Sequence, residues 1–319
     1  MDITGRVLEL METKVILVIG TLSFDVIGST AHAFRSDSLT VPLDEIRYSH
    51  GGRGANFAVF VQALSAGTAL CSSVGEDFRG STYESELQAR QVDLSPLFRS
   101  PSHDTPHIFV FSNGDDARVF VFRDRRQQSD RAYCDWAVRY VEASSFDTLY
   151  CTSEVPMINC AALEASSAAL KVFAPGHDLY LYDRPTLLRC FDAADIVIVN
   201  AAEADVMESI CASDFNEVRS RLTALVVTRG SRGCVVYAST KSLYIDAALP
   251  TRVVDTTGAG DAYAAGFVVE LLKSHDLLRS SQVGNVVASF VIESLGCQTS
   301  VPTPEEVSLR LAATYNIVP

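Results

Sequence analysis

The heptapeptide DTTGAGD, residues 255–261, runs directly into the apolar stretch 262–272, which is predicted to form a helix. Small residues just before a helix let main-chain N–H groups point at one centre, where the helix dipole adds partial positive charge. Such a centre suits a transferring phosphoryl group, whose oxygens accumulate negative charge. The small residues that supply it are Gly258, Ala259 and Gly260.

Asp261 follows these small residues on the first turn of the predicted helix. A carboxylate at this place does not help to bind a phosphate, because like charges repel. We therefore expect Asp261 to act as a general base that takes the proton of the attacking hydroxyl as the phosphoryl group moves. Asp is also a common helix cap, but a cap does not account for the glycine pattern before it.

A second glycine-rich segment, GGRGAN at residues 51–56, opens a predicted helix at residues 57–66. Adjacent glycines allow backbone conformations and close approaches that side chains forbid. Asn56 offers both a hydrogen-bond donor and an acceptor, which suits a vicinal diol. A tight turn into a packed helix is the alternative explanation, and the presence of the DTTGAGD segment in the same chain favours a binding site.

Two further motifs follow predicted strands, where the active sites of open α/β sheets lie. Asn200 and Glu203 come directly after the strand at residues 196–199 and are placed to face metal-bound phosphates. Glu203 equally fits a helix capping box, and the residues alone leave both explanations open. The segment TRGSRG, residues 228–233, offers flexible backbone and cations beside a nucleotide, with a plain β-turn as the alternative.

Apolar, β-branched segments alternate with helix-like segments over most of the chain. The predicted strands are residues 15–19, 69–74, 148–151, 170–174, 196–199, 225–228, 234–237 and 243–245. The predicted helices include residues 81–90, 157–169, 201–211 and 216–222, and most of the chain after residue 245. This alternation predicts an α/β fold with a doubly wound, mostly parallel sheet. Residues 1–13 are expected to be an extension of a single domain at residues 14–319.

One segment breaks this alternation. The pair Asn113-Gly114 separates two strand-like stretches rich in aromatic residues, and such a pair is a strong hairpin signal. Together with residues 41–48 the hairpin is expected to form a small antiparallel layer beside the main sheet. A face with so many rings has to be covered, which favours a lid over an active site, with an ordinary edge hairpin as the alternative. The rings are Phe109, Phe111, Phe120 and Phe122.

The composition limits the classes of ligand and of cellular location. The chain has 319 residues and a formal net charge of −13, so its overall field repels nucleic acid and anionic membranes. A phosphate ligand must therefore be held by local main-chain donors or by magnesium. The eight cysteines form no CxxC pair and no zinc-type spacing, which is typical of buried residues in a reducing cytoplasm. The chain shows no signal peptide and no apolar run near the ~18–20 residues of a membrane span, so we expect a cytoplasmic protein.

In their order and spacing the four motifs resemble those of the ribokinase-like (PfkB) carbohydrate kinase family, over residues from about 15 to about 311. GGRGAN matches the family's N-terminal signature and DTTGAGD its C-terminal one. The resemblance implies a three-layer sandwich with a Rossmann-like sheet and a small β-sheet lid, expected here at about residues 23–50 and 105–125. It also implies MgATP as the phosphoryl donor and, as in many relatives, activation by K⁺.

Carried over position by position, the resemblance implies roles for single residues. Asp261 matches the catalytic base, and residues 258–260 match the anion hole. The residues implied in acceptor binding are Asp25, Gly52, Arg53 and Asn56. Those implied in ATP binding are Asn200, Thr228, Gly230, Gly233, Gly258, Gly260 and Asn285. The residues implied in cation binding are Asn200 and Glu203 for Mg²⁺ through water, and Asp255 and Thr257, with the loop around Gly296, for K⁺.

The identity of the acceptor depends on finer features. Within the family the chain is most similar to archaeal and bacterial nucleoside kinases, in the segments 105–106, 173–179 and 296–299. It departs from relatives at Ala174, where an acidic residue is common, and at Arg53, where Lys or a small residue is common. We expect the rings of Phe109 and Phe111 to hold a nucleobase by stacking, worth about 1–3 kcal/mol per base. A nucleoside is therefore favoured over ribose, fructose or another sugar.

Other functions are weighed against this prediction. A sugar kinase would share all four motifs. A nucleotide- or metabolite-sensing module that kept the fold would be marked by loss of Asp261 or of the glycine pair, and both are present. A dinucleotide-binding dehydrogenase is excluded because no GxGxxG follows the first predicted strand. An apolar lid face would also allow two protomers to pair, so a homodimer is an open alternative to a monomer.

Overall fold

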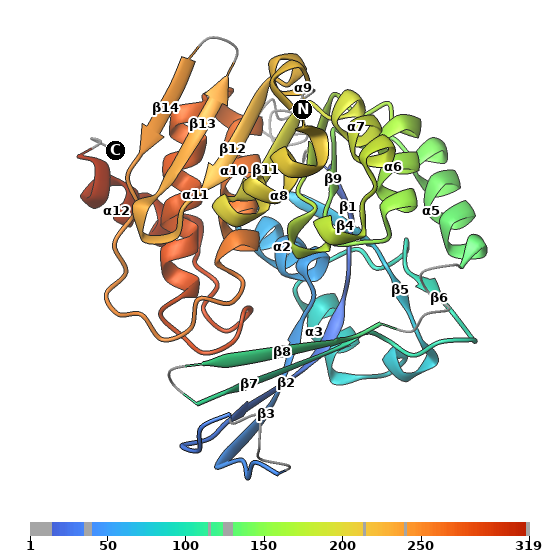
Figure 1. Ribbon diagram of the computed structural model, residues 1–319, viewed down its shortest axis with the longest axis vertical. Helices are drawn as coiled ribbons and strands as arrows, with labels where there is room; N and C mark the ends of the chain where they lie inside the picture. The colour runs from blue at the N-terminus through green and yellow to red at the C-terminus, as the bar shows by residue number, and fades with distance from the viewer. Residues whose placement is uncertain are drawn as a thin grey trace, which may run out of the picture.

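The computed structural model describes residues 15–34, 40–113, 116–123, 130–212, 215–238 and 241–316, so the predicted extension at residues 1–13 lies outside the described residues. At the centre is an eight-stranded sheet in the order β14-β13-β12-β11-β10-β9-β1-β4 (Figure 1). Neighbouring strands from β4 to β12 pair in parallel, and β13 and β14 complete the sheet as antiparallel strands. The strands are β1 (Val15–Ile19), β4 (Gly67–Cys71), β9 (Thr148–Cys151), β10 (Leu170–Phe173), β11 (Ile196–Asn200), β12 (Ala224–Thr228), β13 (Cys234–Ala238) and β14 (Lys241–Ile245).

Continuous apolar runs place these strands at the centre of the molecule. β1 has the sequence VILVI, and its side chains are fully buried from position 16 onward because helices cover both faces of the sheet. One face packs on α2 (Arg53–Ala63), α3 (Thr82–Ala89), α10 (Ala259–Ser274), α11 (Leu277–Val291) and α12 (Pro304–Tyr315). The other packs on α5 (Arg131–Ala143), α6 (Pro156–Ala165), α7 (Arg184–Ala193), α8 (Ala201–Cys211) and α9 (Phe215–Arg221). The expected three-layer, mostly parallel α/β fold is thereby confirmed.

A separate four-stranded sheet, the lid sheet, projects from the main body at the bottom of Figure 1. Its order is β3-β2-β7-β8, with β2 (Ser23–Ser29), β3 (Glu45–Gly51), β7 (His107–Ser112) and β8 (Ala117–Phe122). β7 and β8 form the predicted antiparallel hairpin, although Gly114 in its turn lies outside the described residues. β2 and β7 pair in parallel, so the sheet is mixed and not purely antiparallel. Both strands leave the core in the same direction, since the backbone N–H of Phe24 donates to the carbonyl of Pro106 where each strand starts.

Several element boundaries differ from the sequence prediction. α2 begins at Arg53 and α10 at Ala259, each within its glycine-rich motif, while α6 ends at Ala165 and not at residue 169. The strand predicted at residues 69–74 is divided into β4 and the short β5 (Ser73–Val74), which pairs with β6 (Phe98–Arg99). The sequence prediction lacked α5 and α7. Among the helices of the described ranges, none has the length and apolar character that a membrane span needs.

Candidate active site

Two cavities lie at the carboxyl ends of the parallel strands. The first, of about 570 Å³, is lined by strand-end loops, by the lid sheet and by Asp261. The second, of about 510 Å³, is lined by residues that include Thr228 and Asn285. Asn200 and Gly260 line both cavities, so the two meet at the start of α10. The sequence motifs around residues 56, 200, 230 and 260 are therefore brought to one continuous site.

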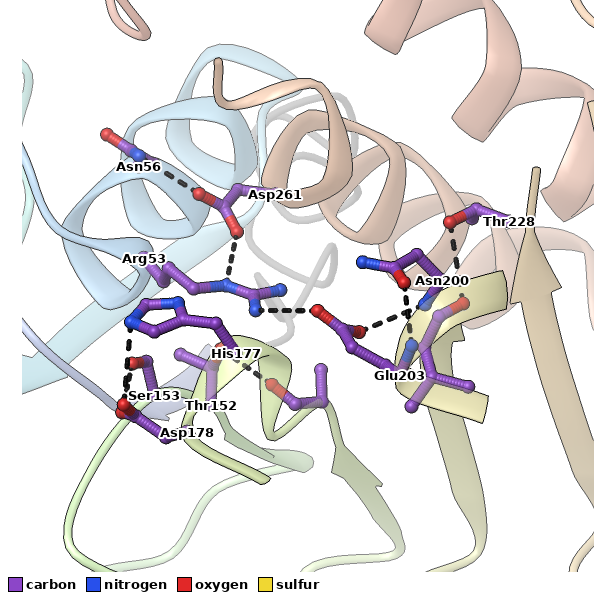
Figure 2. A network of polar contacts seen from close by, with 12 residues as sticks. Arg53, Asn56, Thr152, Ser153, His177, Asp178, Asn200, Glu203, Thr228 and Asp261 are labelled. Atoms are coloured by element: carbon purple, nitrogen blue, oxygen red, sulfur yellow. Dashed lines mark hydrogen bonds and ion pairs between the residues drawn. The ribbon is translucent and has the colours of Figure 1, made fainter. Parts of the chain in front are cut away.

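Asp261 lies on the first turn of α10 and is 95% buried. Its Oδ1 accepts a hydrogen bond from Nε of Arg53 at 2.9 Å, and its Oδ2 accepts one from Nδ2 of Asn56, also at 2.9 Å (Figure 2). Each carboxylate oxygen thus faces one donor from α2. Two motifs separated by about 200 residues of chain are joined through this side chain, and Asp261 lines the first cavity.

The start of α10 has the geometry expected of an anion-binding turn. Gly258 precedes the helix with φ of 81°, a left-handed conformation that favours glycine. A Cβ there would lie 2.8 Å from Cβ of Cys297, whereas a Cβ on Gly260 would meet no atom within 4 Å. First-turn N–H groups have no intrahelical acceptor; the N–H of Ala259 donates to the Thr256 carbonyl at 3.3 Å, and Gly260 lines both cavities.

Arg53 connects the carboxylate of Asp261 to that of Glu203. Its Nη1 lies 3.7 Å from Oε1 of Glu203 while its Nε bonds Asp261, and its side chain is about four-fifths buried (Figure 2). Burial acts to lower the pKa of Arg53, but the carboxylates of Asp261 and Glu203 raise it overall. The guanidinium also lies directly against Gly176, where any Cβ would overlap it. The structure therefore holds a permanent cation beside the Asp261 carboxylate.

Asn200 and Glu203 form a complete capping box at the start of α8. Oδ1 of Asn200 accepts from the Glu203 N–H at 2.9 Å, and Oε2 of Glu203 accepts from the Asn200 N–H at 3.0 Å (Figure 2). Both residues also line the first cavity. Of the two explanations left open by the sequence, the cap is confirmed, and the position of both residues on the cavity is compatible with the prediction that they face phosphates.

The residues expected to contact the nucleotide lie around the second cavity. Thr228, Gly230, Gly233 and Asn285 all line it, as does Gly260, while Gly258 lines only the first cavity. Nδ2 of Asn285 donates to the carbonyl of Asp246 at 2.9 Å. A side chain at Gly233 would lie 2.0 Å from the carbonyl of Ile245, so glycine is required where this turn approaches β14.

Asp255 ties together the two loops in which a potassium position was expected. Its Oδ1 accepts from both the N–H and the hydroxyl of Thr257, at 2.9 and 2.6 Å, and its Oδ2 accepts from the Gly296 N–H at 3.0 Å. Within the described ranges no group of three or more His, Cys, Asp or Glu side chains is placed to hold a metal ion. A cation here would have to be bound by Asp255 together with hydroxyl, main-chain or water oxygens.

Asp25 and Gly52 line the first cavity beside Asn56. Gly52 has φ of 91°, and a Cβ there would lie 2.5 Å from Cα of Leu22, which leaves room only for glycine. The hydroxyl of Ser23 donates to Oδ1 of Asp25 at 2.7 Å. Burial raises the pKa of Asp25 to about 7, against the opposite effect of the Ser23 hydrogen bond. The site thus contains a carboxyl group that titrates near neutral pH.

This carboxyl group gives a prediction for stability. The folded pKa of Asp25 lies above its unfolded value of 3.8. Its contribution to the free energy of unfolding is therefore fully present below about pH 4 and is lost as the pH rises through about 7. Asp25→Asn is expected to raise the free energy of unfolding by about 1–3 kcal/mol at pH 8, with a gain that shrinks toward pH 4. Urea unfolding at pH 5 and pH 8 measures this gain in the free energy of unfolding. Asp135→Asn, on the exposed surface of α5, is the control. An equal gain at both pH values would contradict the assignment.

The lid presents aliphatic side chains to the first cavity, not aromatic ones. Ile108, Val119 and Val121 line it, and Ile108 pairs across strands with both Asp25 and Val121. Phe109 and Phe111 are not among the lining residues, because side chains alternate between the two faces of a strand. The structure does not bring these two rings to the first cavity, so an aliphatic wall stands where an aromatic platform was expected.

Sequence reasoning missed a charged pair at the edge of the first cavity. Arg123 directly follows β8 and lines the cavity, and its Nη2 donates to Oδ2 of Asp178 at 3.0 Å. The two side chains are 7% and 3% exposed, so this ion pair fastens the end of the lid hairpin to the core. The only sequence signal was a charged residue immediately after an apolar strand.

Comparison with known proteins agrees with this geometry. Residues 13–304 match the model of the pfkB family of carbohydrate kinases. The chain is 31% identical over 280 residues to the nucleoside kinase of Methanocaldococcus jannaschii, covering 87% of this chain and 90% of that protein. It is also 31% identical over 311 residues to the nucleoside kinase of Methanothermobacter thermautotrophicus, covering 97% and 99%.

A solved structure shows the same fold. The crystal structure of the M. jannaschii nucleoside kinase, described as an archaeal member of the ribokinase family, superposes with a TM-score of 0.83 at 28% identity over 94% of this chain and 98% of that one. The family explains why the lid sheet, the α10 turn and the GGRGAN helix occur together. The chain belongs to the pfkB family of carbohydrate kinases and is a ribokinase-like phosphotransferase with an alcohol group as acceptor.

Proposed function

We propose that the protein is a nucleoside kinase that transfers the γ-phosphoryl group of ATP to the primary 5′-hydroxyl of a nucleoside. The observation that carries this proposal is the junction of the two cavities at Gly260 and Asn200, beside the Asp261 carboxylate. The nucleoside occupies the first cavity and ATP the second. The phosphoryl group then crosses at the N-terminus of α10, where main-chain N–H groups and the helix dipole stabilise its charge.

Asp261 is the general base of the proposed reaction. It accepts the proton of the 5′-hydroxyl while the hydroxyl oxygen bonds to the γ-phosphorus, and the bond from phosphorus to the β,γ-bridging oxygen breaks to release ADP. Nε of Arg53 donates to Oδ1 of this carboxylate at 2.9 Å and so orients the carboxylate before the acceptor arrives. The N–H groups of Gly258, Ala259 and Gly260 form the anion hole.

The first cavity is built for a sugar ring with an attached base. Asp25, Asn56 and the main chain at Gly52 supply the polar groups for ring hydroxyls, beside Asp261. The aliphatic wall of Ile108 and Val121 extends the cavity toward the lid, where it covers an apolar, planar group. A cavity of about 570 Å³ exceeds what a free pentose or hexose fills, and the similar archaeal proteins are nucleoside kinases. These points favour a nucleoside over a sugar.

The proposed cations accompany the phosphates and the loops that hold them. Glu203 and Asn200 fit a Mg²⁺ ion held through water, because carboxylate and amide oxygens lie at the cavity junction while their direct hydrogen bonds belong to the capping box. When bound, Mg²⁺ neutralises charge on the phosphate oxygens. K⁺ is assigned to Asp255 and Thr257, whose oxygens converge with the loop at Gly296.

An acceptor panel tests the proposed function. The purified protein with MgATP is given purine and pyrimidine nucleosides, ribose and fructose, and ADP formation is followed while ³¹P NMR identifies the product. We expect kcat/KM for at least one nucleoside to exceed that for either sugar by at least ~10-fold. Phosphorylation of ribose or fructose without turnover of any nucleoside would establish the sugar kinase alternative instead.

A further inference from the structure

A chain of hydrogen bonds leads from the main chain of the GGRGAN segment to Asp261. The hydroxyl of Tyr83 donates to the Gly51 carbonyl at 2.8 Å. Nε2 of Gln298, in the loop after α11, lies 2.8 Å from that hydroxyl and 2.9 Å from Oδ1 of Asn56. Nδ2 of Asn56 in turn lies 2.9 Å from Oδ2 of Asp261. These hydrogen bonds join α3, α2, α10 and the loop after Gly296, in which Gln298 has no role in the proposed reaction so far.

The Gly51 carbonyl determines which group donates in each hydrogen bond of this series. A carbonyl oxygen only accepts, so the Tyr83 hydroxyl must donate to Gly51 and has only lone pairs left for Gln298. Burial raises the pKa of Tyr83 well above its ordinary value, so this phenol keeps its proton. The NH₂ end of Gln298 therefore faces both Tyr83 and Asn56, and Asn56 has to turn its own NH₂ end toward Asp261. The orientation of both amides therefore follows from which groups donate and which accept.

We propose that Gln298 is a positioning residue that sets the orientation of the Asn56 amide, so that Asn56 presents an N–H donor to the Asp261 carboxylate and to the acceptor's ring hydroxyl. The inference rests on the proposed function, because it assigns to Asp261 the role of the base. With the amide reversed, the Asn56 carbonyl would face Oδ2 of Asp261, and two acceptors would meet where a donor is required.

The other charged or titratable groups around Asp261 do not replace this donor. Arg53 bonds Oδ1 and not Oδ2, and Glu203 faces Arg53 from the far side. Tyr150 and Cys297 interact with Asp261 electrostatically, and burial raises the pKa of both, so they are neutral at physiological pH. Among the described residues Oδ2 of Asp261 accepts from Nδ2 of Asn56, and Oδ1 of Asn56 in turn accepts from Gln298.

Gln298→Glu tests the proposal, because it keeps the shape of the side chain and replaces the donor by an acceptor. The introduced carboxylate only accepts, so it draws the NH₂ end of Asn56 toward itself and competes with the Gly51 carbonyl for the single proton of the Tyr83 hydroxyl. The ionised form of Asp261 is then disfavoured. We expect kcat at pH 7 to fall at least ~10-fold and the acid limb of the kcat–pH profile to move up by about one pH unit, with the KM for ATP unchanged.

Two further variants complete the comparison. Gln88→Glu makes the same substitution on the exposed surface of α3 and is expected to match the wild type. Gln298→Met removes the donor without adding charge, so the acid limb of its kcat–pH profile should move in the same direction but by less. This variant also provides the test if Gln298→Glu fails to fold. The positioning role would be overturned if the Gln298 variants kept the acid limb of the wild-type kcat–pH profile and differed only in maximal kcat or in thermal stability.

A structural measurement separates this proposal from the proposed function. Neutron crystal structures of the wild type and of Gln298→Glu, which distinguish the amide nitrogen from its oxygen, are compared at the contact between the Asn56 amide and Asp261. We expect the 2.9 Å hydrogen bond to be present in the wild type and lost in the variant. An unchanged contact refutes the proposal even if the enzyme is active. If the wild type phosphorylates no acceptor, the proposed function fails, while loss of the contact still supports the orienting role of Gln298.

Discussion

Asp261→Asn is expected to lower kcat by about 10²–10⁴-fold, the usual contribution of a general base. The amide has the shape of the carboxylate but cannot take the proton of the acceptor hydroxyl. Affinity for ATP should change little, because the second cavity is lined by Gly260 and not by the Asp261 side chain. Steady-state kinetics measures the first effect and calorimetric titration with ADP the second.

The same substitution is expected to leave the fold intact. Removing one partner of a buried ion pair can cost ~3–5 kcal/mol when the other charge is left uncompensated. Here Arg53 keeps Glu203 at 3.7 Å, so the cation retains a carboxylate and the loss should be smaller. Thermal unfolding of Asp261→Asn and of the exposed control Asp205→Asn on α8 checks this point. Turnover close to that of the wild type in a folded Asp261→Asn protein would refute the assignment of the base.

The sequence was sufficient for the parts of the site that depend on local backbone chemistry. Gly52 was identified because adjacent glycines allow conformations that side chains forbid, and Gly258 because small residues before a helix let main-chain N–H groups converge; the structure has φ of 91° and 81° at these positions. The β-branched runs of the central strands likewise determine that they are buried on both faces. These features follow from a few adjacent residues, so they can be predicted without knowing the tertiary fold.

The orientation of the lid could not be predicted in the same way. The segment Ile108-Phe109-Val110-Phe111 is apolar at every position, so its alternation does not say which set of side chains faces the cavity. Pairing with β2 decides it, since Asp25 is opposite Ile108 and Val26 is opposite Phe109. The aliphatic face therefore joins Asp25 in the lining of the first cavity. A register between strands about 80 residues apart is a tertiary property.

Contacts between distant motifs were also beyond the sequence. Arg53 was expected among the acceptor-binding residues and noted as a departure from related sequences, yet in the structure it bonds Asp261 and approaches Glu203. Gln298 lies in a segment noted only for its resemblance to relatives, and its contact with Asn56 spans 242 positions of the chain. Local propensity contains no information on which long polar side chains meet when separate helix starts converge. Such residues become visible only when hydrogen-bond partners are known.

A methyl group at Gly260 should separate the anion hole from the fold around it. Gly260 has an ordinary helical conformation, and a Cβ there meets no atom within 4 Å, so Gly260→Ala should fold with stability equal to the wild type or up to ~1 kcal/mol higher. The methyl group would nevertheless occupy the junction of the two cavities, where the phosphoryl group has to approach the N–H groups of α10. We expect kcat to fall by about 10²-fold, the scale of losing one donor of an oxyanion hole.

Gly258→Ala is the matched comparison, because it places the same methyl group two residues earlier on the same turn. Its φ of 81° and the contact of 2.8 Å with Cβ of Cys297 should cost about 1–3 kcal/mol of stability in addition to activity. Urea unfolding and kcat measured on both variants give the pattern. If Gly260→Ala loses activity but keeps its stability, and Gly258→Ala loses both, phosphoryl transfer takes place at the start of α10. Wild-type turnover in Gly260→Ala would exclude it, because the space that the methyl group fills would then not be the path of the phosphoryl group.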